Sequence, residues 1–169
     1  MLLQLIPDQE DAFWCLVYVM FQRDWRSIFS DDAQRINQMI NDMEAYLQRS
    51  CRAVHQHLVR QQATMAASFS SQLITLFIYG NDFSAAAKIF ELFLLDGEQV
   101  LVDMLAGMIQ HKKQKILQLE DLELMNYLQK EMAQECLSSM TIRDLLRHPT
   151  SNKPISVKLT FNSVEDTIY

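Results

Sequence analysis

Apolar residues recur at intervals of three and four along most of this 169-residue chain, and this spacing is its most constraining feature. Such a period is typical of amphipathic helices. The clearest stripe follows Ser30 and consists of Ile36, Met39, Ile40, Met43, Tyr46 and Leu47. Average usage would give roughly 12 Gly and 8 Pro, but the chain has three of each. We therefore expect an all-α fold and exclude turn-dense β-sandwiches and disordered chains.

The same period predicts six further helical segments. They span residues 8–21, 51–62, 83–96, 100–108, 122–132 and 141–148. Between them, the Ser- and Ala-rich stretch 66–71 predicts a bend that leads into the apolar run 73–79. We find no repeat of fixed period, which argues against a solenoid. The pattern predicts an irregular array of about seven or eight helices with short connections.

Residues 8–21 form an unusual predicted helix. Asp8 can cap its N-terminus, and Glu10 and Asp11 complement the helix dipole. From Ala12 to Phe21 the sequence is apolar on every side, so we expect other elements to cover it all round. This run of ten residues is about half as long as a membrane span requires. No targeting segment is evident, and we expect an intracellular protein, cytoplasmic by default, that does not insert into membranes.

The net charge of the chain limits its possible partners, and its cysteines indicate the compartment. The chain has 15 Lys and Arg against 21 Asp and Glu, which gives a net charge of −6. Nucleic acid and anionic membranes are therefore poor candidates for direct partners. Cys15, Cys51 and Cys136 are odd in number and widely spaced, as in proteins of a reducing compartment.

Motifs for catalysis or metal binding are missing from the sequence. It contains no Gly-rich phosphate loop, nucleophile elbow or zinc-protease motif. Cys51, His55 and His57 have some metal-like spacing, but His57 lies on another face of the helix. We predict two polar surface histidines there, and no metal or cofactor site.

The C-terminal residues differ from the rest. Ile155, Val157, Leu159 and Phe161 alternate with polar residues, and this period of two is typical of a strand. We therefore divide the chain into a helical domain, 1–148, and an extended arm, 149–169. The strand-like arm either packs on its own domain or binds a partner by adding a strand to that partner's sheet.

Two segments, in this order, resemble the TBC-domain family of Rab GTPase-activating proteins. The first runs from Glu10 to Met20 and is similar to the family's E-D-A-F-W-x-L-V-x-L-M helix. The second is Leu76-Phe77 followed by residues 89–97, similar to L-F and I-W-D-x-F-L-x-x-G. The family-motif residues are Glu10, Asp11, Phe13, Trp14, Phe77, Phe90, Glu91 and Gly97, with Phe90 in place of Trp and Glu91 in place of Asp. The resemblance covers about residues 1–135.

The family's catalytic groups are an Arg finger from I-x-x-D-x-x-R and a Gln finger from Y-x-Q, both preceding the E-D-A-F-W helix. Residues 1–9 contain neither motif, so the resemblance implies the C-terminal half of a TBC domain without catalytic activity. The sequence 141–149 contains D-x-x-R followed by His-Pro, which makes Arg147 a candidate displaced finger. The alternative is an ordinary amphipathic helix with Ile142, Leu145 and Leu146 facing inward.

A half-domain of this kind exposes apolar surface unless another segment covers it. We therefore expect an interaction module whose open face is covered by a partner chain, a second copy or the C-terminal arm. Three function classes remain: an inactive scaffold in a larger assembly, a regulator that binds a Rab-type small GTPase, and an active GTPase activator whose fingers come from another chain or an upstream segment.

Overall fold

The computed structural model describes residues 1–30, 32–147 and 150, and within them every regular element is a helix. The elements in chain order are α1 (Leu2–Leu5), α2 (Gln9–Val17), η1 (Tyr18–Gln22), η2 (Trp25–Phe29), α3 (Gln34–Ser50), α4 (Arg52–Arg60), α5 (Met65–Ile74), α6 (Phe83–Asp96), α7 (Gln99–Ile116), α8 (Asp121–Asn126), η3 (Tyr127–Glu131), α9 (Met132–Ser139) and α10 (Ile142–Leu145). The predicted all-α class is confirmed for these residues. Ile155, Val157, Leu159 and Phe161 lie outside them.

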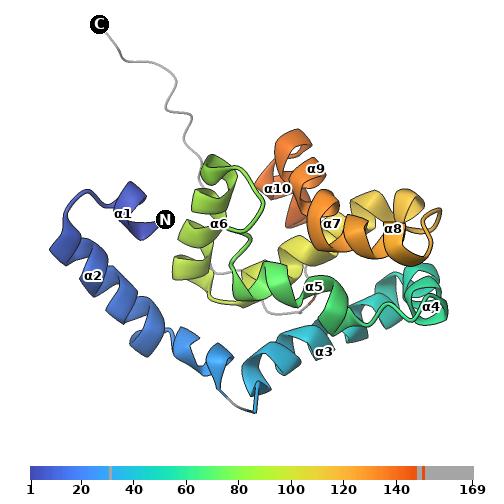
Figure 1. Ribbon diagram of the computed structural model, residues 1–169, viewed down its shortest axis with the longest axis horizontal. Coiled ribbons are helices and arrows are strands. Elements are labelled where there is room, and N and C mark those ends of the chain that lie inside the picture. The colour runs from blue at the N-terminus through green and yellow to red at the C-terminus, as the bar shows by residue number, and fades with distance from the viewer. Residues whose placement is uncertain (31, 148–149, 151–169) are drawn as a thin grey trace, which may run out of the picture.

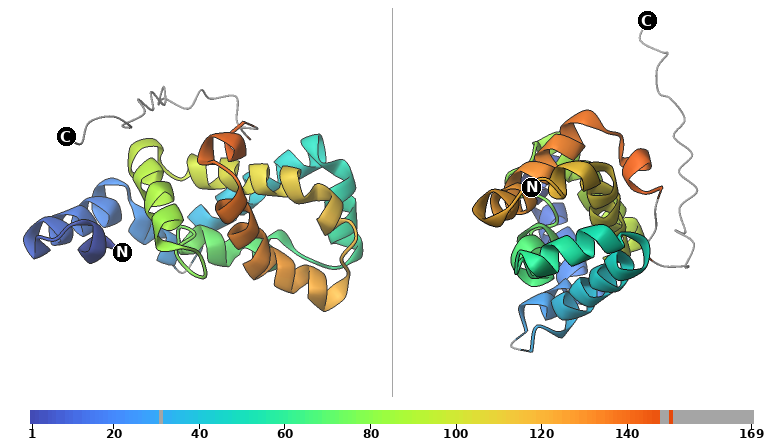
Figure 2. Two further views of the ribbon diagram at one scale, coloured as in Figure 1. Left: turned by 90° about the horizontal axis from the view of Figure 1, so that it is seen from above. Right: turned by 90° about the vertical axis from the view of Figure 1, so that its right-hand side faces the viewer.

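Helix α7 is the centre of the array. Every residue from Val100 to Ile109 is buried, and the helix contacts α3, α6, α9 and α10. At one end of the molecule α1 and α2 project beyond this core, while α4 lies at the other end (Figure 1). The left-hand view in Figure 2 shows the same arrangement from above. The buried segment 100–109 of α7 therefore lies at the centre of the array, and α1 and α2 lie at the edge of the array.

The predicted helix over residues 83–96 is confirmed with both of its ends. The Asp82 carboxylate accepts hydrogen bonds from the backbone N–H groups of Ser84 and Ala85. At the other end, Gly97 adopts a φ of 80° and its N–H donates to the Phe93 carbonyl oxygen. A Cβ would strain this backbone conformation, which explains a glycine at this position.

The bend predicted at residues 66–71 is wrong, because these residues belong to α5. Thr64 caps the helix by accepting from the Ala67 N–H, and the hydroxyls of Ser68 and Ser70 bond to carbonyls four residues earlier. Those bonds satisfy the serine side chains without interrupting the helix. The sharp turn comes later, where Leu76 and Phe77 have positive φ angles of 54° and 59°.

Other predicted boundaries also need correction. The helix predicted at 100–108 continues to Ile116 as α7. Helix α3 begins at Gln34 and not at Ser30, because Ala33 has a left-handed backbone with a φ of 48°. The segment 122–132 is divided among α8, the π-helical turn η3 and the first residue of α9. Leu122 is 84% exposed instead of lying in the apolar stripe. No sequence pattern predicted α1 or η2, which have four and five residues.

Candidate functional site

The start of α2 has the local structure that its sequence predicts. The Asp8 carboxylate caps the helix by accepting hydrogen bonds from the N–H groups of Glu10 (2.9 Å) and Asp11 (3.0 Å). Glu10 and Asp11 occupy the first turn, where negative charge is favourable, and both are exposed. Helix α2 then continues directly into the π-helical turn η1, so residues 9–22 form one rod.

This rod exposes large apolar side chains, and the expectation that other elements cover it on every side is wrong. Ala12 and Val19 are its buried residues, whereas Trp14 is 58% exposed and Phe21 57% exposed. The other exposed apolar residues of the rod are Phe13, Leu16 and Tyr18. Extensive contacts of α2 are confined to its chain neighbours α1 and η1, so the rest of the fold leaves much of the rod uncovered.

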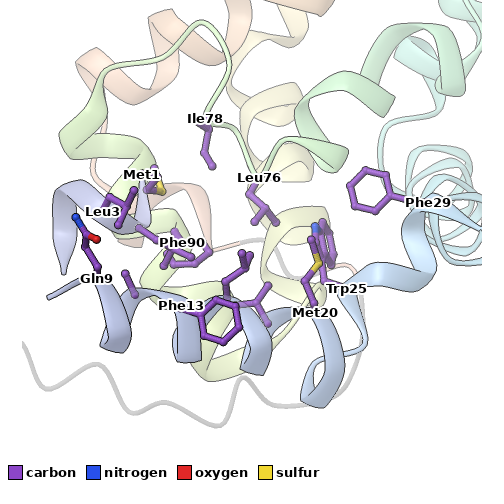
Figure 3. A pocket seen from close by; sticks show the side chains of 14 residues that line it. Met1, Leu3, Gln9, Phe13, Met20, Trp25, Phe29, Leu76, Ile78 and Phe90 are labelled. Carbon is purple, nitrogen blue, oxygen red and sulfur yellow. The ribbon is translucent and has the colours of Figure 1, made fainter. Parts of the chain in front are cut away.

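An open apolar groove of about 540 Å³ lies along one side of the rod (Figure 3). The rod supplies Phe13 and Met20, while Leu76 and Ile78 come from the turn after α5 and Phe90 comes from α6. Gln9 is the single polar side chain in a lining of 14 residues. A groove with this lining suits apolar side chains of a protein better than a charged ligand.

Two arginines attach the rod to the core. The Arg23 guanidinium donates to the carbonyl oxygens of Leu94 and Leu95 at the end of α6. Arg35, in α3, donates to the Arg23 carbonyl oxygen (3.0 Å) and pairs with Glu98 (2.8 Å). These contacts fix the direction of the rod at its C-terminal end.

Aromatic packing adds to this attachment. Trp25 stacks edge-on against Phe93, with ring centroids 4.7 Å apart. Phe93 is also adjacent to Phe90, so the segment that follows the rod packs against aromatic residues of α6. Edge-to-face contacts of this kind are favourable beyond the area they bury.

The family-motif residues fall into two groups. Phe77 and Phe90 are buried in the core, Gly97 ends α6, and Glu91 is exposed on α6. Glu10, Asp11, Phe13 and Trp14 lie on the exposed rod, where the rings of Phe13 and Trp14 form an edge contact with centroids 5.4 Å apart. The groove brings Phe13 and Phe90 into one lining.

Arg147 lies just after α10, far along the chain from the rod. Its side chain is 67% exposed and forms an ion pair with Asp144 at 2.9 Å. The pKa of the Asp144 carboxyl is lowered, chiefly by the hydrogen bond from the Thr141 hydroxyl. Leu145 and Leu146 are buried, as the ordinary amphipathic alternative predicts.

The three residues with metal-like spacing have separate partners. Cys51 Sγ donates to Gln110 Oε1 (2.7 Å), His55 Nε2 lies 3.4 Å from Glu44, and His57 Nε2 lies 2.8 Å from the Leu119 carbonyl oxygen. His57 is buried, which corrects its prediction as a surface histidine. Within the described ranges, no group of His, Cys, Asp and Glu side chains is arranged to hold a metal ion.

Sequence reasoning missed two polar clusters. Asp103 is fully buried in α7, and its Oδ1 atom accepts from Gln99 Nε2, the Thr150 N–H and the Thr150 hydroxyl. Its position inside the apolar run 100–109 is a signal that could have identified it, because buried carboxylates require partners.

The second cluster surrounds Glu135, which pairs with Lys112 (3.0 Å) and Lys115 and accepts from the Tyr127 hydroxyl (3.1 Å). The Lys115 hydrogen bond and these other contacts lower the pKa of Glu135 to about 2. The cluster joins α7 to η3 and α9, and its residues are too far apart in sequence for a local pattern to reveal it.

Among the described helices, none has the length and apolar character needed to cross a membrane. The family profile described as Rab-GTPase-TBC domain matches residues 1–117. The "Ecotropic viral integration site 5 ortholog" of Drosophila melanogaster is 26% identical over 134 residues, which cover 78% of this chain and 16% of that protein. The mouse (Mus musculus) "TBC1 domain family member 2B" is 25% identical over 120 residues, covering 69% of this chain and 12% of that protein. The chain thus spans less than a fifth of the length of either relative.

Proposed function

The chain belongs to the Rab-GTPase-TBC domain family, and from this membership we propose that it is an interaction module without catalytic activity of its own, acting as a scaffold subunit in a larger protein assembly. The observation that carries this proposal is the exposed apolar rod of residues 9–22. Trp14, Tyr18 and Phe21 lie uncovered beside an apolar groove. Contiguous apolar surface of this kind is typical of protein interfaces.

Inactivity is proposed for the polypeptide 1–169 by itself. The family's Arg and Gln fingers precede the E-D-A-F-W helix, and residues 1–9 of this polypeptide contain no arginine. A single arginine finger contributes on the order of 10³–10⁵ in the rate of GTP hydrolysis. Arg147 is a weak substitute, because it lies in a different part of the fold and is paired with Asp144.

Family membership favours a second candidate, a regulator that binds a Rab-type small GTPase without accelerating hydrolysis. The two candidates differ in one property. A GTPase-binding regulator distinguishes the GTP-bound from the GDP-bound partner, whereas a scaffold subunit has no dependence on nucleotide.

Hydrolysis and binding assays test these alternatives. A panel of purified Rab-type GTPases is mixed with the polypeptide, and phosphate release and nucleotide-dependent binding are measured. We expect no acceleration, and no change with Arg147→Ala. Acceleration that Arg147→Ala abolishes would refute inactivity and identify Arg147 as a finger. Binding to the GTP-bound form alone, without acceleration, would establish the regulator instead.

The native mass of the protein purified from its source tests the scaffold role. We expect it in an assembly larger than its own mass of 19.7 kDa, with defined companion chains. Trp14→Asp should release the chain from this assembly. Leu122→Asp, which changes an exposed leucine of α8, should leave the chain in the assembly. A stable monomer that binds no hydrophobic dye would contradict the proposal.

A further inference from the structure

One face of the rod has an ordered sequence of exposed side chains. Glu10, Trp14, Tyr18 and Phe21 are separated by four, four and three residues, so they lie along the same side of a helix. All four are exposed. The side that lines the groove carries a different set, including Ala12, Phe13, Leu16 and Met20. The exposed stripe is therefore a second surface, distinct from the groove.

Charges of opposite sign lie at the two ends of this stripe. Glu10 and Asp11 make its N-terminal end acidic, and residues 12–22 carry no charge. At the other end, the Arg26 guanidinium lies over the Phe21 ring, 4.8 Å from its centroid. The Arg26 side chain is 62% exposed, and its one ion pair within the described residues is a 3.5 Å contact with Asp24. In that same part of the chain, no ion pair involves Glu10 or Asp11.

We infer that this stripe binds a second copy of the chain, with the two rods antiparallel about a two-fold axis near Val17 and Tyr18. This inference rests on the proposed interaction module and names its partner. In that arrangement Trp14 of one copy faces Phe21 of the other, and Glu10 of one copy faces Arg26 of the other. Two-fold packing repeats both contacts, so each end of the stripe meets its electrostatic complement.

The charge pattern favours a second copy over an unrelated apolar partner. The stripe is about 17 Å long, from the rise of 1.5 Å per residue, and it has Glu10 and Asp11 at one end and Arg26 at the other. Its own antiparallel copy is complementary to it at both ends. Between the ends lie the rings of Trp14 and Tyr18, with the Arg23 guanidinium 5.8 Å from the centroid of the Tyr18 ring. A parallel copy would instead place like charges together. An interface of this limited size gives a weak dimer, with a dissociation constant in the micromolar range.

Charge reversal in the full chain tests the pairing of Glu10 with Arg26. Sedimentation should give a concentration-dependent shift from 19.7 kDa to twice that mass for the wild-type chain. Glu10→Lys or Arg26→Glu should each weaken self-association at least tenfold, because each creates two like-charge contacts. An equimolar mixture of these two variants should associate as strongly as wild type, since both cross-pairs are then of opposite sign. Far-ultraviolet circular dichroism checks that each variant is folded.

Matched controls place charge changes on other elements. Glu123→Lys on α8 and Arg60→Glu on α4 alter exposed charges away from the rod and should leave self-association unchanged. If the mixture of Glu10→Lys and Arg26→Glu fails to associate while wild type dimerises, the antiparallel pairing is wrong.

Trp14→Asp separates this inference from the proposed function. In a dimer held by the stripe, Trp14→Asp should abolish self-association, and Leu122→Asp should not. A wild-type chain that stays monomeric at all concentrations overturns the second copy as partner. If that monomer still binds a hydrophobic dye in a manner that requires Trp14, the interaction module stands with another protein as its partner. A monomer without dye binding overturns both.

Discussion

Gly107 in α7 and Leu145 in α10 are in backbone contact: a Cβ placed on Gly107 would lie 1.9 Å from the Leu145 carbonyl oxygen. Glycine costs about 1 kcal/mol relative to alanine in a helix interior, yet here it occupies the middle of the central helix. The close approach explains it, because any side chain at this position would displace α10. The missing Cβ at Gly107 therefore allows α10 to pack this closely against α7.

Gly107→Ala should destabilise the chain by about 3 kcal/mol in spite of its higher helix propensity, since it overpacks a rigid backbone contact. Urea unfolding followed by circular dichroism measures this change. Gln114→Ala, at an exposed position of the same helix, is the matched control and should stay within about 0.5 kcal/mol of wild type. A Gly107→Ala chain as stable as wild type would show that α10 does not pack as described.

Gly107 also illustrates what could be predicted from sequence. Helix 83–96 and the start of α2 were predictable, because Asp82, Gly97 and Asp8 are local signals that act on their own neighbours. The close approach of α10 to Gly107 was not, since it depends on two segments far apart in the chain. The same holds for Asp103, whose partner Thr150 follows 47 residues later.

The candidate site was predicted in part. The motif residues of α2 lie on the exposed rod, whereas the apolar run 12–21 led to the expectation of a helix covered on every side. The way in which α2 is exposed could not be read from the run itself. An apolar run is equally compatible with a buried helix and with an interface, and the choice depends on whether α6 and α1 cover Trp14 and Phe21. Leu122 was wrongly assigned to the apolar stripe of the helix predicted at 122–132. Its spacing fits that stripe, but among the described residues no other element packs against it and it is exposed.

Glu135 predicts an acid-dependent loss of stability. Its pKa is lowered from 4.5 to about 2, first by the hydrogen bond from Lys115. A carboxyl with a depressed pKa in the folded state stabilises the fold above its unfolded pKa. This contribution should therefore be present above about pH 4.5 and disappear as the pH falls towards about 2. Glu135→Gln should flatten the dependence of unfolding free energy on pH in that window.

Urea unfolding at a series of pH values between 2 and 6 measures the effect of Glu135→Gln. The exposed Glu123→Gln on α8 serves as the control and should keep the wild-type slope. Equal slopes for the wild-type and Glu135→Gln chains would show that the lysines do not hold this carboxylate in its charged form.

The three cysteines should differ sharply in reactivity. Cys136 is buried and its pKa is raised to about 11 by burial, and burial likewise raises the pKa of Cys51. Thiolates are the reactive form, so both should resist alkylation of the folded chain at pH 7. Cys15 is half-buried on the rod and should react first. Mass spectrometry after brief treatment with iodoacetamide should show one modified site, which Cys15→Ser removes. Rapid labelling of Cys51 or Cys136 in the folded chain would contradict their burial.

Asp103 should hold Thr150 in place through its buried carboxylate. The Thr150 N–H and hydroxyl donate to Asp103 Oδ1 at 2.8 Å and 2.6 Å, and Arg49 donates to the Thr150 carbonyl oxygen at 2.9 Å. Asp103→Ala removes the acceptor of the amide, whereas Thr150→Val retains the backbone donor. Amide hydrogen exchange at residue 150 should therefore accelerate at least tenfold in Asp103→Ala and less in Thr150→Val. The amide of Met140, the residue that follows α9, donates to the Cys136 carbonyl oxygen and is the internal control for an intact fold. If residue 150 exchanges at the wild-type rate in Asp103→Ala, the buried carboxylate does not hold this segment.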